Sequence, residues 1–274
     1  MKFKAIFFLF NAIILLSLGF ILILPVLLLD WEYTRMFWAA NWYLAAVFAA
    51  FFLGVNWYFL RYWSLYRLLE QEDWSGLQQY LHTEIFDRRH FRYQYVRLYI
   101  HTAIVLSRPE AILTLEEQLR AESPRMHRRF ALLLGIPYLL RSQHEEMAAY
   151  YRDQCDRVSG SQHTWVRWCY GFALFLQKRL ADAAPELTAV LNHTRNSLLQ
   201  LASLYMLGMC PGDQVPPDLR EREACLRRRF SRQRMLAVID RKSDNILVLI
   251  LDQFIRDAVE WLYQGPGAEE HRSD

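Results

Sequence analysis

Residues 131–151 read ALLLGIPYLLRSQHEEMAAYY, in which two apolar stretches flank the polar break RSQHEE at residues 141–146. Gly135, the small residue of the first stretch, has small or apolar counterparts at a fixed step of 36 residues, namely Tyr99, Gly171 and Leu207. The same step joins four further sets: Val96, Leu132, Trp168 and Leu204; Ala111, Met147 and Ala183; Leu115, Tyr151 and Leu187; Leu119, Cys155 and Leu191. A period of this length indicates a repeated supersecondary unit.

The spacing predicts that each unit is a pair of helices. First helices are expected at about 88–106, 125–141 and 163–179, and second helices at about 109–122, 144–158 and 180–193. The second helices carry an apolar stripe of the Ala111, Leu115 and Leu119 type at helical periodicity. Because one pair cannot bury such a stripe alone, neighbouring pairs must stack. We therefore predict an all-α solenoid of about three helix pairs within residues 62–208, in which a half-unit at 73–81 precedes the first full pair.

These residues resemble the tetratricopeptide family. Leu134-Gly135 followed by Tyr138 is similar to that family's Leu-Gly-x-x-Tyr core, and Tyr170-Gly171 followed by Leu174 is a looser copy. The step of 36 exceeds the family's usual 34. The resemblance implies a concave face, lined by the first helices, that accepts a helix or an extended segment of a partner protein.

In that register the concave face is a greasy groove, for which we name the candidate residues Trp165, Trp168, Phe172, Phe175, Leu132, Ile136 and Leu139. Two other interpretations stay open. These side chains are ordinary solenoid core, or they are covered by the chain's own last helix, whose apolar residues from Ile246 to Leu262 need a surface to pack on.

Toward the N-terminus the composition changes. The chain has 274 residues, 53% of them hydrophobic, which is too rich for an ordinary soluble fold. Residues 5–29 and 36–60 contain no charged residue, and each run is long enough as a helix to cross a bilayer. We predict a transmembrane hairpin over 1–61, with helices at about 5–29 and 36–60 and a loop at Asp30–Arg35. A cleaved signal is the alternative, which the length of the first run opposes.

Three features of the hairpin carry further expectations. Ala46, Ala50 and Gly54 recur every four residues as a small-residue ridge, and Asn11 and Asn56 have matching depths that would allow a hydrogen bond between the helices. The aromatic residues expected at the membrane interface are Trp31, Tyr33, Trp38 and Trp42.

The flanking charges predict the orientation. Lys2 and Lys4 precede the hairpin and Arg61 and Arg67 follow it, so both termini should be cytoplasmic, in a bacterial-type cytoplasmic (inner) membrane. All four cysteines follow the hairpin and form no C-x-x-C pair, as expected for reduced thiols.

Beyond residue 208, a Pro- and Gly-containing break at 210–217 interrupts the pattern. C-terminal helices are expected at about 218–238 and 244–263 within the segment 209–265, followed by a disordered tail at 266–274. Residues 220–234, the arginine segment, hold seven arginines against two glutamates. Arg227, Arg228, Arg229 and Arg232 are candidate contacts for lipid headgroups or another anion, although a solvated helix face paired with acids elsewhere is the alternative.

No motif for chemistry is present. His144-Glu145-Glu146 lacks the second histidine of a zinc helix, and the sequence holds no nucleophile elbow, phosphate loop or dinucleotide fingerprint. We therefore expect no catalytic residue, no metal and no cofactor. We also expect no nucleic-acid partner, since the net charge is only +3. The expected function is a membrane-anchored scaffold or adaptor for a protein partner. The alternative is an accessory subunit of a larger membrane complex, associating through its hairpin, and a membrane-bound enzyme comes third.

Overall fold

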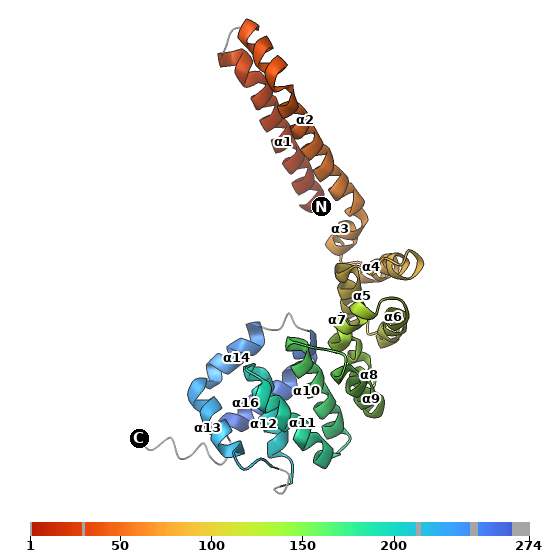
Figure 1. Ribbon diagram of the computed structural model, residues 1–274, viewed down its shortest axis with the longest axis vertical. Coiled ribbons are helices and arrows are strands. Elements are labelled where there is room, and N and C mark those ends of the chain that lie inside the picture. The colour runs from red at the N-terminus through yellow and green to blue at the C-terminus, as the bar shows by residue number, and fades with distance from the viewer. Residues whose placement is uncertain (1, 29–30, 212–214, 242–245, 265–274) are drawn as a thin grey trace. The chain divides into compact units, whose positions relative to one another are not determined.

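A computed structural model of the chain describes residues 2–28, 31–211, 215–241 and 246–264 (Figure 1). These residues form sixteen α-helices and one short π-helical segment, with no strand among them, so the all-α prediction is confirmed. The chain divides into two compact units, residues 1–84 and residues 85–274. Asp30 of the predicted loop, the start of the helix predicted at 244–263 and the tail at 266–274 lie outside the described residues.

The first unit begins with two long helices that pack side by side, α1 (Lys2–Leu28) and α2 (Trp31–Arg61) (Figure 1). Aromatic rings pack between them near one end, where the ring centroids of Phe7 and Phe10 lie 5.5 and 6.2 Å from that of Phe59. The amides of Asn11 and Asn56 each donate to the carbonyl four residues earlier in their own helix, which replaces the expected bond across the hairpin.

The small-residue ridge faces outward. Ala46, Ala50 and Gly54 are all exposed, and a Cβ added at Gly54 would meet nothing within 4 Å. The ridge therefore does not lie between α1 and α2. Trp31 and Trp42 are also exposed.

The predicted loop at Asp30–Arg35 is helical from Trp31 onward. Trp31–Arg35 belong to the first turns of α2, where Glu32 suits the positive end of the helix dipole. The helix is bent, because Asn41 has non-helical φ and ψ of −120° and 23°. No single helix among the described residues qualifies by length and hydropathy as a membrane span. Two parts of α2, Thr34–Leu44 and Ala46–Arg61, qualify together across a 41° bend.

The first unit ends with two short helices, α3 (Trp63–Glu70) and α4 (Trp74–His82). Asp73 caps α4 by accepting a hydrogen bond from the Gly76 amide. The predicted half-unit at 73–81 is thus the second helix of a complete pair. A π-helical segment, Thr83–Asp87, follows α4.

The second unit contains twelve helices among its described residues: α5 (Tyr93–Val105), α6 (Pro109–Glu122), α7 (Pro124–Leu134), α8 (Ile136–Leu140), α9 (His144–Cys155), α10 (Ser161–Leu176), α11 (Leu180–His193), α12 (Ser197–Gly208), α13 (Leu219–Arg229), α14 (Arg232–Arg241), α15 (Ile246–Ile250) and α16 (Asp252–Gln264). Successive helices from α9 to α12 pack on their chain neighbours. The predicted first helix at 125–141 is divided into α7 and α8 at Gly135, because the following Pro137 has no amide hydrogen to donate.

One turn recurs between the two helices of each pair. Glu72, Ser107, Ser142 and Lys178 all have φ between 53° and 61°, in the left-handed region, at intervals of 35, 35 and 36 residues. In each turn the backbone amide of the next residue donates to the carbonyl five residues earlier, in the helix that is ending. The amides of Arg108, Gln143 and Arg179 donate in this way to the carbonyls of Ala103, Tyr138 and Leu174. This arrangement is a Schellman C-cap built without glycine. The turns preserve the repeat where the side chains do not.

The residues 36 apart also make equivalent contacts. A Cβ added to Gly135 would lie 2.5 Å from the Tyr151 hydroxyl oxygen, and one added to Gly171 would lie 3.1 Å from a Leu187 methyl carbon. In both pairs the second residue is 16 positions further along the chain. The first and second helices thus approach most closely at the same place in two successive units.

The C-terminal helices differ from the two long ones predicted. The stretch 218–238 is divided into α13 and α14 at Phe230, which is extended (φ −128°, ψ 136°), and the Ser231 hydroxyl accepts from the Arg234 amide at the start of α14. Helix α16 buries Ile255, Ala258, Val259 and Leu262 and packs against α12.

Candidate functional site

The seven predicted groove residues do not form an open groove. Ile136, Trp168 and Phe172 are 0%, 1% and 4% exposed, so they belong to the core. The other four, Leu132, Leu139, Trp165 and Phe175, are partly buried. Trp165, Trp168 and Phe172 form one aromatic cluster within α10, with successive ring separations of 6.3 and 5.1 Å.

Helix α16 covers this cluster. The Phe254 ring lies 5.3 Å from Phe172 and 6.5 Å from Trp168, and it also contacts Tyr205 of α12 at 5.4 Å. Trp261, two turns further along α16, lies 5.6 Å from Tyr205. The aromatic surface therefore has an occupant from the same chain, as the interpretation with a covering last helix supposed.

A recess that remains open in the second unit is a polar cleft of about 590 Å³ formed by α9, α10 and α11. Its lining is mostly charged or polar: Arg152, Cys155, Asp156, His163, Arg167, Tyr170, Arg179, Asp182, Pro185 and Glu186. Sequence reasoning missed this cleft. The lining residues come from three helices, so the spacing within any one helix gave no signal for it.

Ion pairs fix part of the cleft wall. Arg167 Nε lies 2.6 Å from Glu186 Oε2, and Arg179 contacts Asp182 through two nitrogens at 2.6 and 2.9 Å. Arg152 and Asp156 are exposed on α9 and its end, and no ion pair joins either to another described residue. The cleft thus offers both a cationic and an anionic group to whatever enters.

The cleft's cysteine is not a ready nucleophile. Burial raises the pKa of the Cys155 thiol to about 11, and burial raises that of the nearby Cys169 to about 12. Both stay protonated at neutral pH. In the part of the chain that the structure describes, no three side chains of His, Cys, Asp or Glu gather as a metal site would require.

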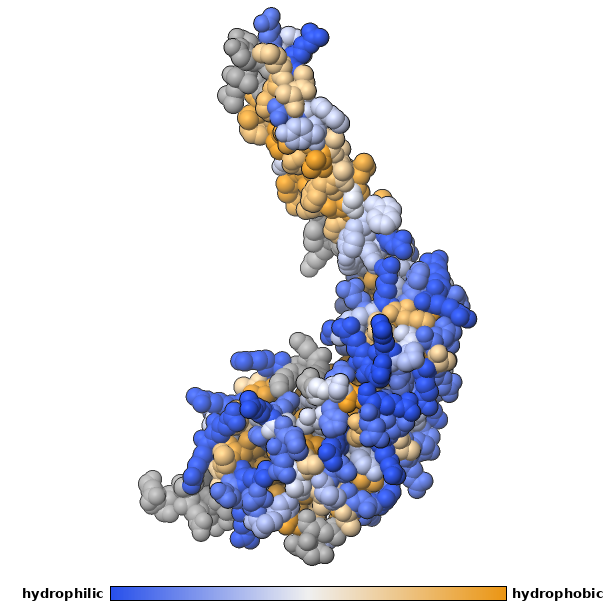
Figure 2. All heavy atoms as spheres, viewed as in Figure 1, coloured by the Kyte–Doolittle hydropathy of each residue, from blue (hydrophilic) through white to orange (hydrophobic). Residues whose placement is uncertain are grey.

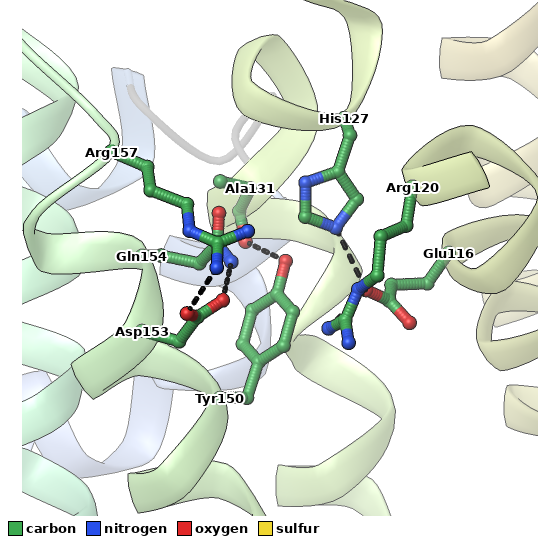
Figure 3. Close-up of polar contacts among 8 residues, drawn as sticks. All are labelled: Glu116, Arg120, His127, Ala131, Tyr150, Asp153, Gln154 and Arg157. Atoms are coloured by element: carbon green, nitrogen blue, oxygen red, sulfur yellow. Dashed lines mark hydrogen bonds and ion pairs between the residues drawn. The ribbon is translucent and has the colours of Figure 1, made fainter. Parts of the chain in front are cut away.

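A buried polar network lies between α6, α7 and α9 (Figure 3). His127 Nε2 is 2.7 Å from Glu116 Oε1, and Arg120 also donates to that carboxylate at 2.7 Å. The Tyr150 hydroxyl donates to the Ala131 carbonyl at 2.9 Å. Burial opposes ionisation of Glu116, but the hydrogen bond from His127 and the charge of Arg120 outweigh it and lower the pKa of that carboxyl. With Glu116 and His127 both buried, we interpret this network as a connection between helices rather than a ligand site.

The arginine segment is only partly available to a ligand. Arg222 pairs with Asp218, Arg227 with Glu223, and Arg232 with Glu260 of α16. Arg228 and Arg229 are exposed, and Arg229 lies over the Phe230 ring at 5.4 Å. Of the four candidate anion contacts, Arg228 and Arg229 are therefore the two without an acidic partner among the described residues.

Comparison with known proteins places the chain in a family. A family model described as "Uncharacterised Treponema protein" matches residues 111–264, more than half of the chain. The chain belongs to this family. The matched region includes α9 to α16, and so the polar cleft and the covering helix as well.

A relative from Treponema pallidum (strain Nichols), named "Uncharacterized protein", is 28% identical over 288 residues. The alignment covers 96% of this chain and 88% of the relative, so the similarity extends beyond the family match and includes most of residues 1–61. No solved structure matches the chain.

Proposed function

We propose that this protein is a membrane-anchored adaptor, in which the hairpin α1–α2 spans a bilayer and the helix pairs bind a protein partner. One observation carries the proposal: the hairpin displays its large apolar side chains outward. Phe8, Leu16, Val47 and Leu53 are 64% exposed or more, and Figure 2 shows apolar side chains gathered over α1 and α2. Apolar surface on this scale needs a bilayer or another protein to cover it.

The orientation is part of the proposal. Lys2 and Lys4 at one end of the hairpin and Arg61 and Arg67 at the other favour cytoplasmic termini in a bacterial inner membrane. The bend of α2 at Asn41 is compatible with a span, because the Asn41 amide is bonded to the Phe37 carbonyl within the helix.

The repeated turn supports a tetratricopeptide-like solenoid. Four left-handed residues at intervals of 35 or 36, each lying between the two helices of a pair, are expected of a stack of equivalent units. We place the partner contact in the polar cleft rather than in the aromatic groove, because α16 already occupies the latter. The exposed Arg152 and Asp156 suit a partner segment that carries both charges.

A second candidate function is favoured by the outward ridge of Ala46, Ala50 and Gly54. Small residues let another helix approach closely in a membrane, and this ridge is not used within the hairpin. In that case the protein is an accessory subunit of a larger membrane complex, held through the hairpin.

Site-specific photocrosslinking in native membranes separates the two. A photoreactive residue at Tyr170 reports on the cleft, one at Gly54 reports on the ridge, and one at the exposed Leu249 is the control. A discrete product from Tyr170 alone supports the adaptor, and one from Gly54 alone supports the accessory subunit. Products no stronger than those from Leu249 at both positions would contradict both functions.

A further inference from the structure

A strongly basic surface lies at the start of the second unit. It is formed by the segment that leads into α5 and by the first turns of α7, and we call it the basic edge. Its arginines are Arg88, Arg89, Arg92, Arg125, Arg128 and Arg129, and its acids are Asp87 and Glu122. All eight are exposed. Six arginines against two acids give a local charge of +4.

Direct contacts join the two parts of the edge. The ring of Tyr93 stacks on Phe130 at 5.0 Å, and the Arg129 guanidinium lies 4.2 Å above the same Tyr93 ring. Arg89 reaches Glu122, just before α7, at 3.4 Å. Residues more than 30 positions apart in the chain therefore make one surface, with a partly exposed aromatic ring among the arginines.

The two acids of the edge are fewer than its six arginines. Glu122 is already shared by Arg89 and by the Gln118 amide. Arg125 lies three and four positions before Arg128 and Arg129, so these three share one helix face and repel one another. Neither Arg125 nor Arg128 forms an ion pair with any residue that the structure describes.

The helix ends add to this charge. Second helices begin with acids, as α6 does with Glu110 and α11 with Asp182, which is the usual complement to a helix dipole. The first turns of α5 and α7 contain no acid, and that of α7 contains Arg125. The edge thus accumulates positive charge where folding alone would favour negative charge.

We propose that the basic edge binds the anionic headgroups of the bilayer in which the hairpin is embedded. This inference rests on the proposed membrane anchor. Arginine phosphate contacts and an aromatic ring at headgroup depth are typical of such a surface. The 26 residues between Arg61 and Arg88 include α3 and α4, so the chain can separate the edge from the hairpin by at most about 50 Å.

The test uses the full chain in nanodiscs of phosphatidylcholine, with or without phosphatidylglycerol. The substitution Gln94→Cys provides a site for a fluorophore at an exposed position in the first turn of α5. The exposed Cys225 is replaced by Ser so that it is not labelled. Cys155 reacts slowly at neutral pH because burial raises its pKa to about 11. A nitroxide headgroup lipid quenches the fluorophore when the edge lies on the bilayer.

We expect strong quenching only in anionic nanodiscs, with loss at high salt. The double variant R125E/R128E should lower the ratio of bilayer-bound to released edge by roughly thirtyfold or more. Each arginine near an anionic surface contributes about fivefold to this ratio. The matched control R141E/R195E changes the same charge at two exposed positions elsewhere and should quench like the parent.

Three results would overturn the inference: equal quenching in neutral and anionic nanodiscs, quenching unaffected by R125E/R128E, or loss of quenching in R141E/R195E as well. An edge that instead binds an acidic protein would give the first of these. Failure of the anchor itself is distinguishable, because the chain would then not enter nanodiscs at all.

Discussion

The hairpin and the helix pairs use the same apolar side chains in opposite ways. Leu16 of α1 is 75% exposed, whereas Leu115 of α6, at a repeat position, is fully buried. Among the described side chains of residues 2–61, Thr34 alone is buried, while the second unit has buried apolar residues from Ile85 to Leu262. The helix pairs bury their leucines away from water, whereas the proposed membrane anchor accounts for the exposed ones of the hairpin by placing them against lipid.

The largest effect should come from charging the outward face of the hairpin. In the variant L16R/V47R both arginines would lie near the middle of a span. Inserting each of them into the bilayer would cost about 2.5–3.5 kcal/mol. We expect loss of the fraction that resists alkaline carbonate extraction. L249R places the same charge on an exposed leucine of the second unit and should leave extraction unchanged. Carbonate resistance in L16R/V47R equal to that of the parent would show that the outward face of the hairpin does not lie in lipid.

The inward face of the second unit is tested most strongly at Trp168. Trp168→Ala should lower the free energy of unfolding by about 3–5 kcal/mol, because it leaves a cavity among Trp165, Phe172 and Phe254. Chemical denaturation of the detergent-solubilised protein measures the change. The neighbouring Trp165→Ala, at a partly buried position, should cost less; the reverse order would show that α16 does not cover Trp168.

The close approach of paired helices can be tested at two equivalent glycines. Gly135→Ala should destabilise by about 1–3 kcal/mol, because the new methyl group would overlap the buried Tyr151 ring. Gly171→Ala is its counterpart one unit later and should cost less, since its nearest neighbour is a Leu187 methyl carbon at 3.1 Å. Equal losses of stability for the two variants in thermal unfolding would mean that the helices do not approach more closely at Gly135 than at Gly171.

The buried network predicts a pH-dependent effect. Glu116→Gln should cost about 1–3 kcal/mol at neutral pH, because it weakens charge-assisted bonds to His127 and Arg120. Since the pKa of Glu116 is lowered in the folded state, its contribution is complete above the unfolded pKa of about 4.3 and is lost as pH falls through the folded value. The difference between parent and variant should therefore narrow only under acid conditions.

Its control is the adjacent Glu117→Gln, at an exposed position, which should stay within about 0.5 kcal/mol of the parent. A stability difference for Glu116→Gln that stays constant down to strongly acid pH would contradict the role given to the ionised carboxylate.

The smallest effect concerns the recurring turn. Ser107→Gly should stabilise by about 0.5–1 kcal/mol, because glycine removes the strain of a left-handed residue at φ 53°. Ser123→Gly, at φ −140° between α6 and α7, has no such strain and should be neutral or destabilising. A stabilisation of the same size in Ser123→Gly would show that the gain at Ser107 does not come from relief of left-handed backbone strain.

Much of the fold could be predicted from the sequence. The second helices α6 and α11 begin and end at the residues expected, because Pro109 and the apolar stripes mark them clearly. The repeated turns could not be predicted, since Glu72, Ser107, Ser142 and Lys178 share no side-chain signature and only their backbone conformation recurs. The break at Gly135 was missed although Pro137 marks it. The break at Phe230 was missed because residues 218–238 contain no proline or glycine.

The candidate site was harder to predict than the fold. Periodicity indicated that Trp168 and Phe172 lie on the inner side of α10, but it could not tell whether a partner or α16 covers them. The polar cleft depends on which charged side chains of three helices converge, and the pairing of Arg167 with Glu186 joins different helices. Such convergence is a tertiary property that spacing within one helix does not contain.

If the proposed anchor is right, the outward face of the hairpin lies in lipid and the second unit lies in water. Cysteines can be introduced one at a time at Leu16, Val47 and Leu249, in a C225S background whose other cysteines are buried or half-buried, and exposed to a membrane-impermeant maleimide in proteoliposomes. The C225S protein with no added cysteine gives the background labelling. We predict rapid labelling at position 249, for protein with its second unit outside, and protection at positions 16 and 47 until the protein is denatured. Equally rapid labelling at all three positions in intact proteoliposomes would contradict the claim.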